Sequence, residues 1–222
     1  MVNPALVKYL IAFLESSVPL TDHAYYERLE ITKARYESIA ETIAEVSVEA
    51  PLFADDADGV KTGALLASIA GFEGALRDDI DNCKRGGDPH PVTKVYQAWT
   101  LWQLHANKEK VCASRVAGAR VAREMIRHSF KTCHKLAVPD RLSVYTDGVC
   151  KSNWSRSRHR MERASRWVST HPFTSETNEN SNRQFPGSAF YLYDGNSRDC
   201  NCNLQRHSVG VCYISPTCDC SN

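Results

Sequence analysis

The chain has 222 residues, of which 42% are hydrophobic and 24% charged, and its formal net charge is +1. This balance is typical of an ordinary globular protein and excludes a global basic excess for nucleic acid. No apolar run approaches the roughly 18 residues of a membrane span. The early run YLIAFL at residues 9–14 is too short, and it lacks a clear signal-peptide cleavage pattern.

The first part of the chain has helical periodicity. We expect a short helix within residues 1–19, followed by a longer amphipathic helix over residues 25–48. The apolar and aromatic positions of the longer helix recur at spacings of three, four and seven: Tyr25, Tyr26, Leu29, Tyr36, Ile39, Ile43 and Val46. The segment APLFADDADG at residues 50–59 then predicts a loop whose aspartates cap the next helix.

The next apolar run, ALLASIAGFEGAL at residues 64–76, contains one carboxylate, Glu73. With 3.6 residues per turn, Glu73 lies one turn after Ile69 and two turns after Leu66, on the apolar stripe. A charge in that position is costly. Either the helix ends at Gly71 and Glu73 reaches solvent, or Glu73 occupies a partly dry site where its proton is useful.

The second half contains further helical patterns separated by loops. DNCKRGGDPHP at residues 81–91 predicts a loop, and residues 112–130 predict a helix. After about Trp167 the composition shifts to Ser, Thr, Asn and Gly without a lasting period, which predicts a poorly ordered tail.

Together these patterns predict an all-α protein in three parts. We expect an N-terminal helix in residues 1–19, a compact helical domain in residues 20–166 and a low-order Cys-rich tail in residues 167–222. We find no internal repeat.

The chain has nine cysteines, five of them in the last 23 residues, which indicates that the protein works in an oxidising compartment or binds a metal. We expect Cys133 and Cys150 to form a bridge across the turn around Pro139, which leaves Cys83 to pair with Cys112. Other connectivities remain open. The tail cysteines lack the two-residue gap of common zinc knuckles, so we expect disulfides or loose thiols there rather than zinc.

Three segments, IAGFEGAL, AWTLWQLH and LSVYTDGVC, occur in that order at residues 69–76, 98–105 and 142–150. They resemble the motifs of the lysozyme-like soluble lytic transglycosylase superfamily. In that family an apolar helix ends in a catalytic Glu, a Gly-Leu-Met-Gln-like turn follows, and a later helix carries Ala-Tyr-Asn-Ala-Gly or a variant. The resemblance spans roughly residues 25–166 and implies a lysozyme-like helical domain.

The resemblance implies roles for individual residues. Glu73 matches the catalytic acid, Leu101 and Gln103 match the second motif, and Tyr145 with Gly148 matches the third. Gln103 and Tyr145 would position a sugar acetamido group or the acid itself, because each carries fixed polar atoms on an apolar body. The alternative for both is an ordinary place in or beside the core.

Two tryptophans lie within the second segment, and several positions depart from the family pattern. Trp99 and Trp102 either stack on sugar faces or belong to the core. The departures are Gly74 in place of Ser, Thr100 in place of Gly, and Thr146 and Asp147 in place of Asn-Ala. Gly74 also loosens the helix end that should hold Glu73.

The expected chemistry is glycosidic bond cleavage. Apolar neighbours such as Ile69 and Leu101 would disfavour the charged form of Glu73 and leave a proton for the leaving oxygen. A hydrolase usually needs a second carboxylate, but Asp78, Asp79 and Asp81 fit a solvated loop better. In the family one Glu suffices, because the C6 hydroxyl of the substrate attacks and an anhydro product forms; the sequence leans toward this route.

We therefore expect an enzyme that cleaves the bond between N-acetylmuramic acid and N-acetylglucosamine in peptidoglycan glycan strands, outside the cytoplasm or in a virion. No cofactor is implied, and no residue spacing indicates a metal site. One alternative is a non-catalytic cell-wall-binding or structural virion module. Another is nucleic-acid binding through residues 151–167, which hold six Lys or Arg against one Glu, although a solvated basic helix explains that stretch equally.

Overall fold

The computed structural model describes residues 2–77, 99 and 111–175, and their regular structure is entirely helical, which confirms the predicted all-α class. The α-helices are α1 (Pro4–Ser17), α2 (Leu29–Glu49), α3 (Val60–Gly74), α6 (Arg115–Thr132), α7 (Ser143–Asp147) and α8 (Ser155–Thr170). Two 3₁₀ turns, η1 (Leu20–His23) and η4 (Val138–Asp140), join them. Among the described helices, none has the length and apolar character needed to cross a bilayer.

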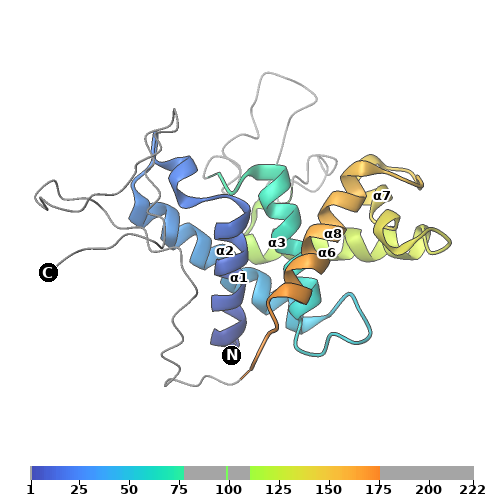
Figure 1. The fold of residues 1–222 in the computed structure, drawn as a ribbon, viewed down its shortest axis with the longest axis horizontal. Helices are drawn as coiled ribbons and strands as arrows, with labels where there is room; N and C mark the ends of the chain where they lie inside the picture. The colour runs from blue at the N-terminus through green and yellow to red at the C-terminus, as the bar shows by residue number, and fades with distance from the viewer. Residues whose placement is uncertain (1, 78–98, 100–110, 176–222) are drawn as a thin grey trace, which may run out of the picture. The chain divides into compact units, whose positions relative to one another are not determined.

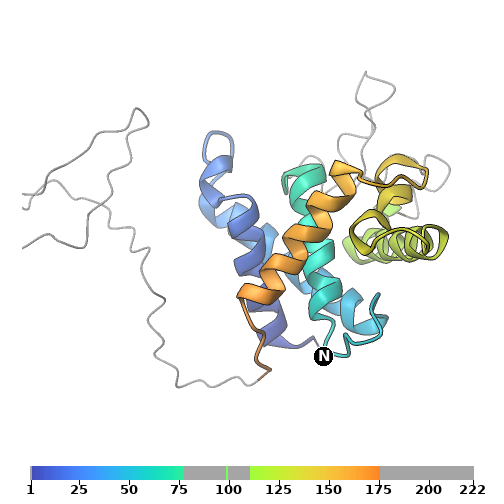
Figure 2. The same cartoon turned by 45° about the vertical axis from the view of Figure 1, so that its right-hand side comes forward.

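Helix α3 is the centre of the arrangement. It packs along α8 and against α1, α2 and α6, and in Figure 2 α8 crosses α3 while α1 lies to one side of it. Figure 1 shows α7 beyond α8, away from α1, and α6 running behind α3 and α8. Ten residues of α3 between Thr62 and Gly74 are buried, because helices surround it.

Helices α1 and α2 form one side of this core. Asn3 caps α1 by accepting a hydrogen bond from the Ala5 amide (2.9 Å), and Pro4 opens the helix. Helix α2 begins at Leu29, four residues later than predicted, and Tyr25 and Tyr26 are exposed in the preceding turn. Leu29, another predicted core position, is exposed at the first turn of α2, whereas Tyr36, Ile39, Ile43 and Val46 are fully buried.

The aspartate-rich loop caps α3 as predicted. Asp56 accepts hydrogen bonds from the amides of Lys61 (2.8 Å) and Thr62 (2.7 Å) and from the Thr62 hydroxyl (2.6 Å). Gly59 precedes the helix at a φ of 71°, and a Cβ there would lie 2.9 Å from the Ser47 backbone. Only glycine fits this position without strain.

Helix α6 starts at Arg115 rather than Cys112, because the Ser114 hydroxyl caps it by accepting from the Ala117 amide (3.0 Å). The predicted bridge between Cys133 and Cys150 is present, with 5.5 Å between the Cα atoms. It ties the end of α6 to the segment after α7. Cys112 also forms a disulfide, and Cys83, its expected partner, lies outside the described residues.

The described structure does not divide at the expected domain boundaries. Helix α1 packs against α2 and α3, and α8 continues through residue 166 to Thr170. The Trp167 ring stacks on Phe13 with 4.9 Å between centroids, and Phe173 meets Tyr9 edge-on at 5.6 Å. Residues 1–177 form one compact unit, and the remainder of the predicted tail lies outside the described residues.

Candidate active site at the end of helix α3

Glu73 lies on the last turn of α3 and is paired with Arg160 of α8. Its Oε1 atom accepts a hydrogen bond from Arg160 Nη2. The Glu73 side chain is 21% exposed and the Arg160 side chain 9% exposed. The helix therefore continues past Gly71. Glu73 is neither fully exposed to solvent nor in a purely apolar site: its side chain is half-buried, and a buried cation matches its charge.

The guanidinium of Arg160 is held from several directions. Its Nη1 atom donates to the Arg156 carbonyl (2.7 Å), and its Cζ lies 5.2 Å from the centroid of the Phe72 ring. Its Nε atom is buried without a hydrogen-bond partner in the described part of the chain. Arg160 is thus fixed by packing and by two hydrogen bonds, while the Oε2 atom of Glu73 accepts none from the described residues.

The backbone after Glu73 turns sharply. Ala75 and Leu76 both have positive φ values, 46° and 55°, which are unfavourable for residues with a Cβ. Leu76 is fully buried, and its carbonyl accepts from Arg35 Nε at 2.8 Å. Arg35 in turn pairs with Glu27 through both terminal nitrogens. Burial and this ion pair stabilise the turn and therefore set where α3 ends.

Tyr145 lies beside the Glu73–Arg160 pair. Its hydroxyl donates to the Trp99 carbonyl at 2.7 Å. Burial raises the pKa of Tyr145, the nearby Glu73 carboxylate raises it further, and Arg160 opposes the change. The hydroxyl is therefore a proton-bearing group within electrostatic reach of Glu73 and Arg160, although its own hydrogen bond goes to Trp99.

The structure assigns Trp99 to the core. Its side chain is fully buried, and its indole Nε1 donates to the Leu66 carbonyl at 3.2 Å. A buried ring of this kind has no free face for a sugar, so the core alternative for Trp99 holds. Leu101, Trp102 and Gln103 lie outside the described residues, and their roles stay predictions.

Arg160 is a residue of this site that the sequence analysis did not single out. The buried positions of α8 are Ser157, Arg160, Met161 and Ala164, so Arg160 lies on the stripe that faces α3. Glu73 lies on the equivalent stripe of its own helix. Two opposite charges, each on an apolar stripe of a different helix, are a signal for a buried pair.

The cations of the basic stretch, residues 151–167, are partly neutralised by carboxylates elsewhere in the chain. Of its six cations, Lys151 pairs with Asp147, Arg158 with Asp140 and Arg160 with Glu73. This leaves fewer cations for a polyanion than the sequence count implies, and it weakens the nucleic-acid alternative.

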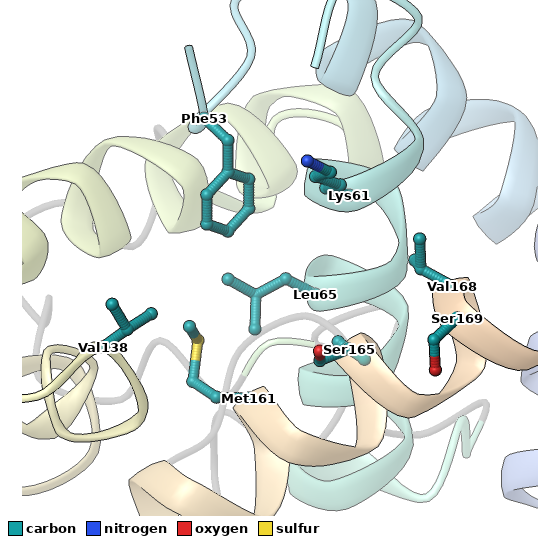
Figure 3. Close-up of a pocket in the computed structure, with 9 residues that line it drawn as sticks. Phe53, Lys61, Leu65, Val138, Met161, Ser165, Val168 and Ser169 are labelled. Atoms are coloured by element: carbon teal, nitrogen blue, oxygen red, sulfur yellow. The ribbon is translucent and has the colours of Figure 1, made fainter. Parts of the chain in front are cut away.

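A separate apolar pocket lies near the other end of α3. Figure 3 shows Leu65 of α3 and Met161 of α8 at its centre, with Phe53 and Lys61 on its upper side. Its volume is about 320 Å³. Glu73 does not line it, because eight residues separate Leu65 from Glu73 and a helix rises about 12 Å over that distance. The pocket therefore adds no group to the candidate site.

Comparisons with models of known protein families, with curated proteins and with solved structures found no match for this chain. Its functional interpretation therefore depends on its own residues. The geometry that carries this interpretation is the Glu73–Arg160 pair at the end of α3, with Tyr145 in electrostatic reach of both.

Proposed function

We propose that this protein cleaves peptidoglycan glycan strands between N-acetylmuramic acid and N-acetylglucosamine, with Glu73 as the catalytic acid. The main support is that Tyr145, which matches one motif of the lytic transglycosylases, lies within electrostatic reach of Glu73, which matches another. Residues 72 apart in sequence have no local reason to meet. A fold that brings them together agrees with a shared role at one substrate site.

The geometry of Glu73 fits proton donation from one particular oxygen. Oε1 accepts from Arg160, whereas Oε2 has no donor among the described residues and would be the oxygen open to a substrate. A general acid needs a proton on the side of the leaving oxygen. Arg160 would fix the carboxyl plane through Oε1, and the Tyr145 hydroxyl would supply a neutral dipole beside it.

Two routes follow protonation of the glycosidic oxygen. Attack by the C6 hydroxyl of the muramic acid on C1 breaks the glycosidic bond and gives a 1,6-anhydro product; the hydroxyl proton passes to the Glu73 carboxylate, so no second carboxylate is needed. Attack by water gives a reducing end and usually needs one. Asp78, Asp79 and Asp81 lie outside the described residues, and Asp147 is already paired with Lys151. We propose the anhydro route on this basis.

Mass spectrometry of purified peptidoglycan after incubation with the full chain tests the proposal. We expect soluble disaccharide-peptides with 1,6-anhydro ends from the wild type and from Glu41→Gln, an exposed carboxylate on α2. We expect none from Glu73→Gln. Reducing-end products would replace the anhydro route with hydrolysis, and equal release by Glu73→Gln would remove Glu73 from the mechanism.

A non-catalytic cell-wall-binding module is the second candidate, and the Glu73–Arg160 pair is the observation that favours it. An arginine that neutralises the acid serves a purely structural role equally well. Co-sedimentation with insoluble peptidoglycan separates the candidates. Retention without any soluble product would support the binding module and contradict the enzyme.

A further inference from the structure

We propose that the outer face of α8 binds the carboxylates of the peptide that muramic acid carries next to the scissile bond. This surface, here called the α8 cationic surface, is a hollow of about 600 Å³ lined by Ser155, Arg158, His159, Glu162, Arg163 and Arg166. The inference rests on the proposed function and names the part of the substrate that this surface would recognise.

Arg163 and Arg166 are the cations available on this surface. Arg158 is engaged by Asp140, whereas no carboxylate in the described part of the chain pairs with Arg163 or Arg166. Among the described residues, the Arg163 side chain makes one hydrogen bond, from Nη2 to the Ser16 carbonyl at 3.3 Å. Guanidinium groups stay charged at neutral pH and have the planar fork that matches a carboxylate.

Arg163 is preorganised by aromatic rings. Its Cζ lies 5.3 Å from the Phe72 ring centroid and 6.0 Å from that of Phe13. His159 meets the same Phe72 ring edge-on at 4.7 Å. A charged side chain that is already held in place loses little entropy when it binds an anion, so this arrangement favours a ligand more than a mobile surface arginine does.

The surface adjoins the candidate catalytic residue through Phe72. Phe72 directly precedes Glu73, and the guanidinium groups of Arg160 and Arg163 both lie over its ring. A glycan strand whose scissile bond lies at Glu73 carries its lactyl-linked peptide on the adjacent muramic acid. That peptide is the anionic part of the substrate nearest to α8.

Glu162 distinguishes a peptide from a uniform polyanion. Its exposed carboxylate lies in the same hollow, between the available arginines and Arg158. Phosphate polymers would be repelled by it, whereas a stem peptide with carboxylates and a free amino group offers both charges. The mixed charge therefore favours the peptide.

Isothermal titration calorimetry with the full chain tests this inference. The probes are a soluble disaccharide-tetrapeptide from peptidoglycan, neutral chitotetraose and polyglycerol phosphate. We expect Arg163→Gln/Arg166→Gln to bind the disaccharide-tetrapeptide about tenfold or more weakly than the wild type, and chitotetraose equally well. Arg166→Gln alone should show a smaller loss of affinity for the disaccharide-tetrapeptide. Because residue 166 is exposed, this single substitution leaves folding unaffected.

Lys33→Gln/Lys131→Gln is the matched control, because it removes the same charge from α2 and α6 at exposed positions. It should bind every probe like the wild type. If the arginine variants bind the disaccharide-tetrapeptide as tightly as the wild type, or if the lysine control loses as much, the inference is overturned while cleavage by the wild type still supports the function. Tighter binding of polyglycerol phosphate than of the peptide would also overturn it. A wild type that neither binds nor cleaves any peptidoglycan probe removes the proposed function itself.

Discussion

Asp140 and Glu73 each pair with an arginine of α8, Asp140 with Arg158 and Glu73 with Arg160, but the surroundings of the two carboxylates differ. Asp140 is 2% exposed and accepts four hydrogen bonds: from the amides of Asn153 (3.0 Å) and Trp154 (3.2 Å), and from Arg158 Nε (2.8 Å) and Nη2 (3.0 Å). Glu73 is 21% exposed and accepts one, from Arg160. Asp140 is therefore saturated, whereas one oxygen of Glu73 has no donor within residues 2–77, 99 and 111–175.

The difference marks Asp140 as a structural carboxylate and is compatible with the role proposed for Glu73. Trp154, at the N-cap of α8, makes no side-chain capping bond, and Asp140 bonds the amides just before that helix instead. The Arg158 guanidinium, together with these amides, lowers the pKa of Asp140 to about 2. A carboxylate held this firmly in its ionised form stabilises the fold but has no proton to donate at neutral pH.

The largest expected effect is on activity, at Glu73. We expect Glu73→Gln to lower the rate of peptidoglycan cleavage by about 10²- to 10⁴-fold, because the amide cannot donate the required proton as an acid. Soluble fragments released from dye-labelled peptidoglycan measure this rate. Wild-type release by the variant would show that Glu73 is a structural partner of Arg160 only.

The next largest effect concerns the segment that holds both Asp140 and Tyr145. The Cys133–Cys150 bridge closes this segment, with a sequence separation of 17. Loop-closure arguments give about 3 kcal/mol for a loop of this size. We expect Cys133→Ser/Cys150→Ser to lower the free energy of unfolding in urea by that amount. An unchanged midpoint and slope would show that the bridge contributes no stability.

A smaller loss is expected from Asp140→Asn. The amide group of Asn would place a donor against the donors of Asn153, Trp154 and Arg158, so the destabilisation should be about 2 kcal/mol. In Glu73→Gln, the amide oxygen can still accept from Arg160, and the NH₂ group takes the place of Oε2, which has no donor among the described residues. We therefore expect this variant to lose about 1 kcal/mol of unfolding free energy. Urea unfolding of both variants checks this order, and the reverse order would contradict the comparison.

The smallest effect is a pH dependence. The pKa of Asp140 is about 2 in the folded protein and about 3.9 in an unfolded chain. Its stabilisation is therefore fully present above about pH 4 and is lost as the pH falls through about 2. The difference in unfolding free energy between the wild type and Asp140→Asn should shrink over this range. A constant difference would mean that the Asp140 charge does not contribute.

Local features of the fold were predictable from the sequence. The burial of Tyr36 and Ile39 follows from helical spacing, the cap at Asp56 follows from the aspartate-rich loop, and the bridge across Pro139 follows from cysteine spacing. Each depends on residues close together in the chain, where periodicity and turn chemistry act directly.

Long-range partners were less accessible. Periodicity placed Glu73 on an apolar stripe but did not indicate that Arg160, 87 residues later, would pair with it. It also placed Tyr25 and Tyr26 within a helix, although both rings lie exposed before α2 begins. The packing of Trp167 on Phe13 joins the two ends of the described unit, and no local pattern encodes such a contact.

The most direct test of the distinction between the two carboxylates measures cleavage per folded molecule for Glu73→Gln and Asp140→Asn in parallel, at a temperature where circular dichroism shows both folded. We predict that Asp140→Asn cleaves peptidoglycan at the wild-type rate and that Glu73→Gln loses cleavage. Equal activity in the two variants, or loss in Asp140→Asn with retention in Glu73→Gln, would contradict it.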